Sequence, residues 1–447
     1  MDKIFKLFFL LIFFFLFSCS FSNRGGFFED KLKDLEEEVY KKNSKLVFAP
    51  EKKFREEISG KTKKGISRAY ENLDWPQNNF SSTNFIPNLF YTNKKELSYK
   101  SKKLGKNKFR GSDIFFEPII FENDLFFYDV SGNIYKFSIK EKKISWKYNF
   151  YKKRYKNTQI NLKLIISNRQ LIVSDNLGYI YSLSDESGKL NWAKNYGVPF
   201  TSNIKIENGN IFLLNQDNKY YVLNEVDGEK ITSLETFPSF LKSNQETNIS
   251  LDSRGNVYFI TSSGEMYSIN FITGNLNWFT SLGAGSITND TELFFSSPIV
   301  FEDNKLYFSS SISTFSINTS NGTSNWKLPF GTYLKPVVTE HHLFLSSKDG
   351  FFISLDKKTG KVIWSKDLFN ITNKLNKKKV GEINSLILIS DQLLLSTTGG
   401  YFFFIDYRNG KIKSYTKASG SGFFSKSIIS NKKIFVLDKK MRILIFN

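Results

Sequence analysis

The residues that could carry out chemistry are few, and they are not grouped as a catalytic or metal site requires. The only two histidines, His341 and His342, are adjacent, so on a strand their side chains point to opposite faces. No third ligand stands at metal-binding spacing, no glycine-rich phosphate loop opens a helix, and no nucleophile pairs convincingly with a base. The sequence therefore predicts no catalytic residue, no metal site and no cofactor, and a turn position explains both histidines.

The single cysteine, Cys19, is the residue whose setting indicates a covalent modification. Two lysines precede an apolar run at 7–17, which is too short to span a bilayer and suits the core of a signal peptide. The sequence Leu16-Phe17-Ser18-Cys19 resembles a bacterial lipobox, in which the thiol is acylated, with palmitate among the expected chains. We expect removal of a signal peptide at 1–18 and lipidation of Cys19; an ordinary signal peptide with a chance cysteine is the alternative.

The chain carries a formal charge of +20 over 447 residues. A nucleic-acid-binding protein would cluster its basic residues beside stacking aromatic rings, whereas these lysines are scattered over turns and exposed strand faces. Export also argues against a nucleic-acid partner. We expect the charge to solvate the surface, with attraction to acidic lipids or to an acidic partner as the alternative.

A pattern of about 45 residues repeats along the chain and predicts the fold. Each copy contains a hydrophobic hairpin, a Gly-containing turn and then a Trp, as in Thr273-Gly274-Asn275-Leu276-Asn277-Trp278. This length fits one four-stranded sheet per copy, which is the unit of a β-propeller. A large ring at the end of each fourth strand can dock on the next blade, so we expect a packing role for Trp146, Trp192, Trp278, Trp326 and Trp364.

Seven complete blades are followed by a remainder with only three strands, which would leave an unpaired edge where the ring should close. The segment 96–104, just before the first blade, supplies the missing strand. The sequence thus predicts an all-β chain: an eight-bladed β-propeller of four-stranded antiparallel blades, the last closed by an N-terminal strand. We expect a signal peptide at 1–18, a lipid-anchored and largely irregular tether at 19–74, and the propeller at 75–447.

Two sequence features resemble a known family. The Gly-x-hydrophobic-x-Trp pattern is similar to the pyrroloquinoline-quinone (PQQ) type repeat. Asn72-Leu73-Asp74-Trp75-Pro76-Gln77 resembles the stretch that opens the propeller of the BamB family, lipoproteins of the outer-membrane β-barrel assembly (BAM) complex. The resemblance implies a non-enzymatic scaffold, lipid-anchored on the periplasmic side of the cell outer membrane. It implies binding to the periplasmic POTRA domains of BamA and to other BAM components, and assistance to the folding and insertion of β-barrel precursors. Unfolded outer-membrane proteins are the further partners that it suggests.

In that family, inter-blade loops on one face of the ring contact BamA. The segment 235–243 is similar to the family's apolar-plus-basic docking loop, and exposed apolar anchors beside a cation are typical of interface hot spots. The alternative is a loop that folds its phenylalanines back onto its own blade. In the next loop, 283–295, acidic residues are present but offset from the family's positions. The candidate BamA-binding residues are Phe237, Phe240, Leu241, Lys242, Asp290 and Glu292.

Two other classes of protein remain as alternatives. A PQQ-dependent dehydrogenase shares the eight-bladed repeat, but such enzymes resemble one another in using a vicinal cysteine pair and a Ca²⁺ held by carboxylate and amide oxygens. A chain with one cysteine cannot form that pair. An envelope lipoprotein adaptor of another process, binding a peptide or glycan in the central channel, is not excluded, because fold does not fix function.

Overall fold

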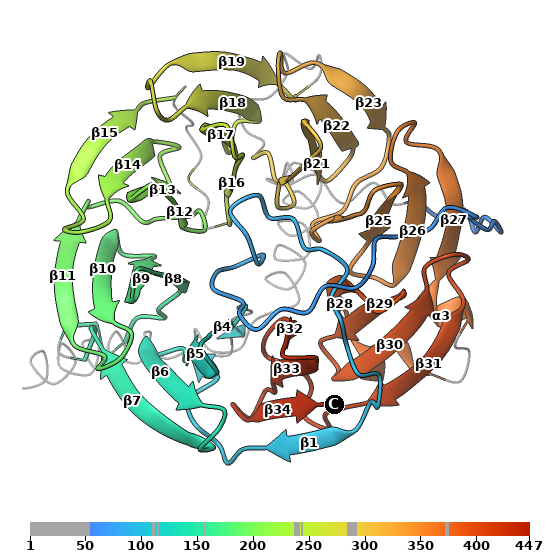
Figure 1. Cartoon of the computed structure of the whole chain (residues 1–447), viewed down its shortest axis with the longest axis horizontal. Coiled ribbons are helices and arrows are strands. Elements are labelled where there is room, and N and C mark those ends of the chain that lie inside the picture. Colours follow the sequence, from blue (N-terminus) through green and yellow to red (C-terminus); the bar gives the residue numbers. More distant parts are fainter. Residues whose placement is uncertain are drawn as a thin grey trace, which may run out of the picture. The chain divides into compact units, whose positions relative to one another are not determined.

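Eight four-stranded antiparallel sheets stand around a common centre as the blades of a β-propeller (Figure 1). The computed structural model describes residues 54–109, 112–113, 116–152, 154–155, 157–236, 242, 245–283, 293–371 and 375–447. All of these belong to one unit of the chain, Phe48–Asn447. The fold predicted from the repeat is confirmed. Within the described residues, no helix has the length and apolar character needed to cross a membrane.

The first four blades follow one another along the chain, each running from the centre of the ring to its rim. Blade 1 contains β4 (Ile119–Phe121), β5 (Asp124–Tyr128), β6 (Asn133–Ser138) and β7 (Lys143–Asn149). Blade 2 contains β8 (Leu162–Ser167), β9 (Gln170–Asp175), β10 (Tyr179–Ser184) and β11 (Leu190–Asn195). Blade 3 contains β12 (Lys205–Glu207), β13 (Asn210–Leu214), β14 (Tyr220–Asn224) and β15 (Lys230–Leu234). Blade 4 contains β16 (Asn248–Leu251), β17 (Asn256–Ile260), β18 (Glu265–Asn270) and β19 (Leu276–Ser281).

The next three blades repeat this order. Blade 5 contains β20 (Val300–Glu302), β21 (Lys305–Ser309), β22 (Thr314–Asn318) and β23 (Ser324–Leu328). Blade 6 contains β24 (Val337–Val338), β25 (His342–Ser346), β26 (Phe351–Asp356) and β27 (Val362–Asp367). Blade 7 contains β28 (Ile383–Ile389), β29 (Gln392–Thr397), β30 (Tyr401–Asp406) and β31 (Ile412–Lys417). Short helices α3 (Leu368–Ile371) and α4 (Lys377–Val380) join blades 6 and 7, and β2 (Lys108–Phe109) pairs with β3 (Ser112–Asp113).

Blade 8 is assembled from both ends of the propeller sequence. Its strands are β32 (Ile428–Ser430), β33 (Lys433–Leu437), β34 (Ile443–Phe446) and the N-terminal β1 (Leu97–Lys100), which pairs antiparallel with β34. Beside the strands, the backbone N–H of Asn447 donates to the carbonyl of Glu96 at 2.9 Å. The predicted closure is confirmed, and it leaves no three-stranded blade with an open edge.

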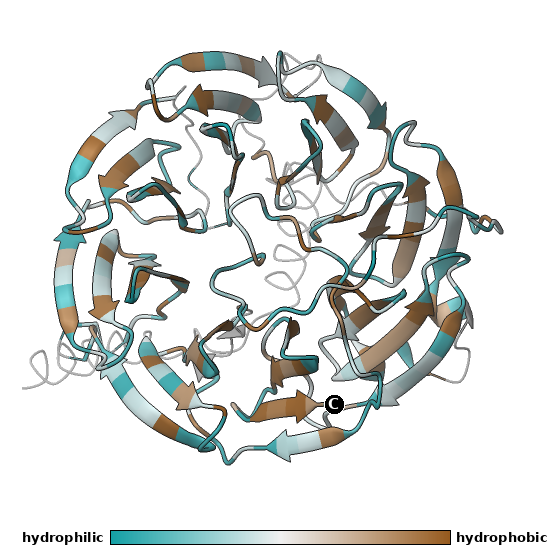
Figure 2. Cartoon of the chain, in the orientation of Figure 1, coloured by the Kyte–Doolittle hydropathy of each residue, from teal (hydrophilic) through white to brown (hydrophobic). Residues whose placement is uncertain are grey.

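The hydrophobic pattern differs between inner and outer strands, as the packing of a blade requires. The middle strand β30 is buried over Tyr401–Ile405, because blades pack against both of its faces. The fourth strands β11 and β31 instead alternate half-buried and exposed residues, since one face packs on the neighbouring blade and the other meets solvent. Figure 2 shows the same contrast between the largely hydrophobic β34 and the banded outer strands.

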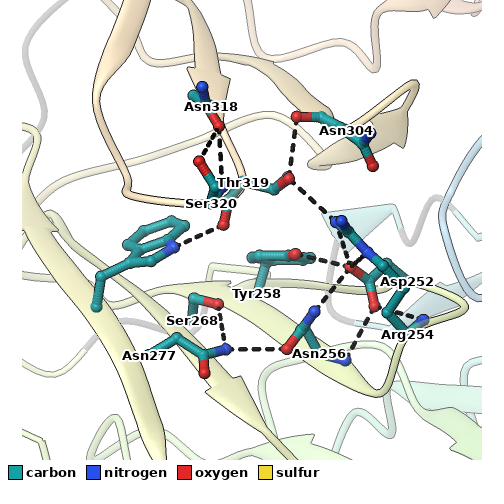
Figure 3. Close-up of polar contacts among 11 residues, drawn as sticks. Asp252, Arg254, Asn256, Tyr258, Ser268, Asn277, Asn304, Asn318, Thr319 and Ser320 are labelled. Atoms are coloured by element: carbon teal, nitrogen blue, oxygen red, sulfur yellow. Dashed lines mark hydrogen bonds and ion pairs between the residues drawn. The ribbon is translucent and has the colours of Figure 1, made fainter.

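An Asp side chain organises several of the turns. In blade 4, Asp252 Oδ1 accepts the backbone N–H groups of Arg254 at 2.9 Å and Asn256 at 3.0 Å, while Oδ2 accepts the hydroxyl of Tyr258 at 2.8 Å (Figure 3). Burial raises the pKa of Asp252, but the hydrogen bonds that it accepts outweigh burial and the net pKa is lowered. Arg254 also donates to Thr319 Oγ1 at 3.2 Å, so this turn joins blade 4 to blade 5.

Each repeated Trp packs on the next blade, directly over the Gly of that blade's turn. Trp278 Nε1 donates to the carbonyl of Thr319 at 2.7 Å, and a Cβ added to Gly322 would lie 2.6 Å from the Trp278 ring. The same ring-over-Gly contact recurs for the pairs Trp146–Gly188, Trp192–Gly228, Trp326–Gly360 and Trp364–Gly410. The turn Gly is therefore needed for its space as well as for its positive φ.

Among the seven blades that are continuous in sequence, the two that lack a Trp show what the contact depends on. Blade 3 has Thr232 in the Trp position, and Gly274 of blade 4 has open space, with nothing within 4 Å of an added Cβ. Blade 7 has Ser414, whose hydroxyl accepts from Lys95 Nζ at 2.7 Å. The ring that occupies the space beside the Gly thus comes from the preceding blade.

We predict that Gly322→Ala destabilises the protein more than Gly274→Ala. Both glycines have positive φ, +73° and +77°, so both substitutions carry a backbone cost of about 1–2 kcal/mol. Only Gly322→Ala also meets a Trp ring, which adds about 1–3 kcal/mol of overpacking. Thermal and urea unfolding of the two variants would measure the difference. Equal losses of stability would show that the Trp contact does not hold the blades together.

Candidate functional site

Six of the seven residues predicted for lipidation or partner binding lie outside the described part of the chain. Cys19 belongs to this group, and so do Phe237, Phe240, Leu241, Asp290 and Glu292. Lys242 is described: it is exposed, and its Nζ forms an ion pair with Asp217 of the β13–β14 turn. The five repeated tryptophans all occupy the packing positions given above.

The bases of the two candidate loops are anchored side by side on blades 3 and 4. At the start of the first loop, Thr236 Oγ1 donates to the carbonyl of Asn218 at 3.0 Å. Asn218 also bonds to Ser262 of blade 4 through both its amide nitrogen and its amide oxygen, at 2.9 Å each. At the end of the second loop, Phe294 N–H donates to the carbonyl of Ser262 at 2.7 Å. This hydrogen-bond network therefore fixes the start of the first loop and the end of the second.

The connectivity of a blade gives the ring two different faces. In four antiparallel strands, the turns between strands one and two and between strands three and four lie at one end, which we call the turn face. The turn between strands two and three and the connection to the next blade lie at the other end, which we call the connection face. The candidate segments 235–243 and 283–295 belong to the connections between β15 and β16 and between β19 and β20, which start and end at the connection face.

An irregular stretch of chain, residues 72–92, crosses the centre of the ring (Figure 1). We call it the central segment. It reaches the first-to-second-strand turns of blades 1, 7 and 8, so it approaches from the turn face: Glu122 N–H donates to Asp74 Oδ1, Ser390 N–H to the carbonyl of Leu89, and Asn431 N–H to the carbonyl of Asn72. The centre of the ring is thus occupied by the protein's own chain, which is bonded there to turns of blades 1, 7 and 8 (Figure 1).

The central segment is hydrogen-bonded to residues of all eight blades or of the connections leading into them. The bonds that show this are Trp75 N to Ile120 O, Ile166 N to Pro76 O, Lys205 Nζ to Ser81 O, Leu251 N to Ser82 O, Phe301 N to Thr83 O, Lys335 Nζ to Asn84 O, Leu89 N to Leu388 O, and Asn72 Nδ2 to Ile429 O. These bonds satisfy backbone groups at the inner edge of the ring, where unpaired groups would be costly.

Charged side chains hold the central segment from the ring side. Glu117, buried just before β4, accepts Trp75 Nε1 and the backbone N–H of Asn79 on the same carboxylate oxygen, at 2.6 Å each. Lys205 of β12 is fully buried and donates to the side-chain oxygen of Gln77 at 3.1 Å and to the carbonyl of Ser81 at 2.8 Å. The opening motif Asn72–Gln77 therefore acts as a structural anchor.

The lysines near the centre are strongly affected by burial. Burial lowers the pKa of Lys205 to about 7, against the opposing attraction of Glu117 and Glu246. Burial also lowers the pKa of Lys335 to about 7, again opposed by Glu117 and reinforced by repulsion from Lys426 and Lys205. Both amines therefore change charge near neutral pH when the protein is folded.

Residues 54–71, ahead of the central segment, lie along blades 5 to 7. The Phe54 ring packs against Phe330 with 5.0 Å between centroids, and Ser365 N–H donates to the carbonyl of Ile58 at 3.1 Å. Thr62 Oγ1 lies 2.9 Å from Nε2 of His342, which is the first residue of β25 and fully buried. Within its described residues, the predicted tether is packed on the ring.

The two histidines serve different purposes. Burial lowers the pKa of His342 to about 4, so this side chain is neutral at physiological pH and stacks on Phe344. His341 is half-buried, and its Nε2 lies 3.7 Å from Glu340 Oε1. Among the described residues, no three His, Cys, Asp or Glu side chains gather in a way that could hold a metal ion.

The charged residues at the ring centre were not predicted from sequence, although a signal exists. Glu117, Lys335 and Lys426 each stand two residues before a first strand, which begins at Ile119, Val337 and Ile428. Charged side chains at this repeated position, next to strands that are otherwise apolar, indicate a shared polar centre. The sequence did not show which groups would meet there, because the central segment that unites them has no repeat.

Known proteins resemble this chain both in sequence and in fold. A family model described as outer membrane protein assembly factor BamB matches residues 164–366, which span blades 2 to 6. BamB of Legionella pneumophila is 23% identical over 39% of this chain and 44% of its own length, and BamB of Shewanella oneidensis is 26% identical over 31% of this chain and 33% of its own. The crystal structure of BamB from Moraxella catarrhalis superimposes with a TM-score of 0.62, at 13% identity, over 79% of this chain and 99% of that one.

This chain is an eight-bladed β-propeller whose blades 2 to 6 resemble the BamB family. The sequence matches span less than half the length of either curated BamB relative, so they do not carry those proteins' partners to this chain. A europium-containing methanol dehydrogenase superimposes equally well, with a TM-score of 0.62 at 12% identity over 81% of this chain and 89% of the enzyme. Structural likeness at such identities shows the fold alone.

We predict that Lys205→Met flattens the dependence of stability on pH between about pH 7 and pH 9.5. An unfolded lysine titrates near its model value of 10.5, whereas folded Lys205 titrates at about 7. The unfolded state therefore binds more protons in this window, so the wild-type free energy of unfolding rises with pH by at most about 1.4 kcal/mol per unit from this group.

Urea unfolding at pH 7, 8 and 9 would measure the effect. The matched control is Lys361→Met, which removes an exposed lysine of the turn face and should follow the wild-type profile. Parallel profiles for Lys205→Met and the wild type would show that Lys205 does not titrate in this range.

Proposed function

We propose that this protein is a non-enzymatic scaffold lipoprotein of the outer-membrane protein assembly machinery. In this proposal it binds the periplasmic POTRA domains of BamA and, through the BAM complex, assists the folding and insertion of β-barrel precursors. The observation that carries the proposal is the match of the BamB family model to residues 164–366. That region contains both candidate docking loops and the blades that anchor them.

The arrangement of the two faces supports the same function. The central segment occupies the centre of the ring, whereas the connection face carries the loops around Lys242 and ahead of Leu293. A protein that binds a partner without catalysing a reaction needs a rigid surface with a few anchoring side chains. The network through Asn218 and Ser262 gives the two loops such a rigid base.

A dehydrogenase function is the alternative, and the shared fold with methanol dehydrogenase is the observation that raises it. The other alternative, an adaptor that binds a peptide or glycan in the central channel, needs space for that ligand there. In this protein the channel is crossed by residues 72–92, and a cavity that the described residues form beside them has a volume of about 90 Å³, below the roughly 300–1,000 Å³ typical of cofactor and drug-sized pockets. The scaffold function fits this centre better than the alternatives do.

The proposal places Phe237, Phe240, Leu241 and Lys242 in the first docking loop and Asp290 and Glu292 in the second. We predict that the double substitution Leu241→Glu and Lys242→Glu weakens binding to the BamA periplasmic domains by about 2 kcal/mol or more, because it removes an apolar anchor and reverses a charge. Calorimetry with the purified domains would measure the loss.

The matched control is Leu276→Glu with Lys361→Glu. It makes the same change of charge at an exposed leucine of the rim and an exposed lysine of the turn face. If both double variants bind like the wild type, the first loop is not part of the interface. If the wild type itself does not bind, the scaffold proposal fails.

The anchor is proposed at Cys19, so Cys19→Ala should move the protein from the membrane to the soluble periplasmic fraction. Two or three acyl chains hold a protein firmly, whereas removal of the acylated thiol removes all of them. Fractionation of cells, with immunodetection of the protein, would measure the shift. Continued membrane association of the variant would place the anchor elsewhere.

A further inference from the structure

A small cavity lies at the centre of the ring beside the central segment, with the charged residues Glu117, Lys335 and Lys426 set in a largely apolar wall. Its volume is about 90 Å³, and Trp75 and Asn79 of the central segment form part of its wall. The ring residues that line it stand just before first strands or near their start, among them Lys335, Lys426 and Ser427. Because inter-blade connections lead into those strand ends, the cavity lies toward the connection face.

The charges around the cavity are unbalanced. Four lysines, Lys163, Lys205, Lys335 and Lys426, share the centre with the two carboxylates Glu117 and Glu246, as their mutual effects on one another show. Lys163 is paired with Glu246, and Lys426 Nζ lies 3.7 Å from Glu117 Oε2. Of these groups, Lys335, Lys426 and Glu117 line the cavity, so one positive charge of its wall remains uncompensated when both lysines are protonated.

Lys335 has the weakest set of partners in this group. Its Nζ donates to the carbonyl of Asn84 at 3.2 Å, and no carboxylate of the described residues lies within 4.0 Å of it. A buried or half-buried ammonium is unfavourable unless a negative charge or several acceptors surround it. Lys335 lines the cavity, so a negative group placed there would meet it directly.

A neutral donor in the cavity wall also lacks a partner. Ser427 is 1% exposed, lines the cavity, and has a hydroxyl with no hydrogen-bond partner within the described structure. Buried hydroxyl groups are nearly always hydrogen-bonded, so an unused one needs an explanation. A hydroxyl beside two ammonium groups is a set of donors suited to an anion's oxygen atoms.

We propose that this cavity is a binding site for a small oxyanion, either an inorganic anion such as phosphate or sulfate or a small carboxylate, held by Lys335, Lys426 and Ser427. Its volume fits an anion of this size and is too small for a large ring cofactor. The anion offsets the excess positive charge at the point where the central segment meets the blades. This inference stands apart from the proposed function, since it requires no protein partner.

The probes are sodium phosphate, sulfate and acetate, each titrated into the full-length protein against sodium chloride at equal ionic strength. We expect saturable binding by calorimetry, broadening of the ³¹P signal of phosphate, and a rise in melting temperature that saturates. Phosphate and sulfate binding without acetate binding would identify the tetrahedral anions as ligands, and the reverse order would identify a carboxylate.

Three variants test which residues hold the anion. Lys335→Met and Lys426→Met should each weaken binding at least tenfold, and Ser427→Ala, which leaves all charges in place, should weaken it several-fold. Lys361→Met removes one positive charge at an exposed position and should bind like the wild type. Circular dichroism spectra would confirm that each variant is folded.

Two results would overturn the inference. Absence of saturable binding by the wild-type protein would mean that the cavity holds water only. Equal binding by the wild type, Ser427→Ala and both cavity lysine variants would mean that the anion binds elsewhere on a basic surface. The Ser427→Ala result remains decisive if either lysine variant fails to fold.

Discussion

The structure depends on how the inner edge of the ring is satisfied. Eight first strands converge on the centre, and each presents backbone groups that no neighbouring strand pairs. Residues 72–92 supply partners to all eight blades, with Glu117 and Lys205 fixing the segment at Trp75, Gln77 and Ser81. After residue 92 the chain leaves the centre and continues into β1, which pairs with β34 and closes blade 8.

Contacts between blades are simpler and repetitive. A Trp at the rim of one blade covers the turn Gly of the next, so the size of one residue is matched to the absence of a side chain at another. Such pairs act between neighbours only, as in other repeat proteins. The central segment is different because it contacts every blade at once. Local pairs set the spacing of the ring, and the segment joins the blades into one unit.

The repeated features of the propeller could be predicted from the sequence, whereas the position of the central segment, which occurs once, could not. The Gly and Trp positions, the number of blades and the closing strand all follow from a pattern of about 45 residues, which copies itself and can be counted. Residues 72–92 have no periodicity, so nothing in the pattern placed them at the centre. Asn72–Gln77 was identified by resemblance, but its role became clear only from its bonds to Ile429, Glu117 and Lys205. The docking loops remain a prediction, since their candidate binding residues other than Lys242 lie outside the described residues.

The β-propeller fold occurs in both enzymes and binding proteins, so the function of a given propeller has to be argued from the groups that occupy its centre. Here the centre holds a segment of the protein's own chain, four lysines and two glutamates, and a cavity of about 90 Å³. Removal of the segment would break hydrogen bonds to seven blades and to the connection that leads into blade 6. The centre is therefore built for rigidity and for small ions. A scaffold needs that rigidity, because loops on the connection face can hold a partner in one geometry only if the ring beneath them does not move.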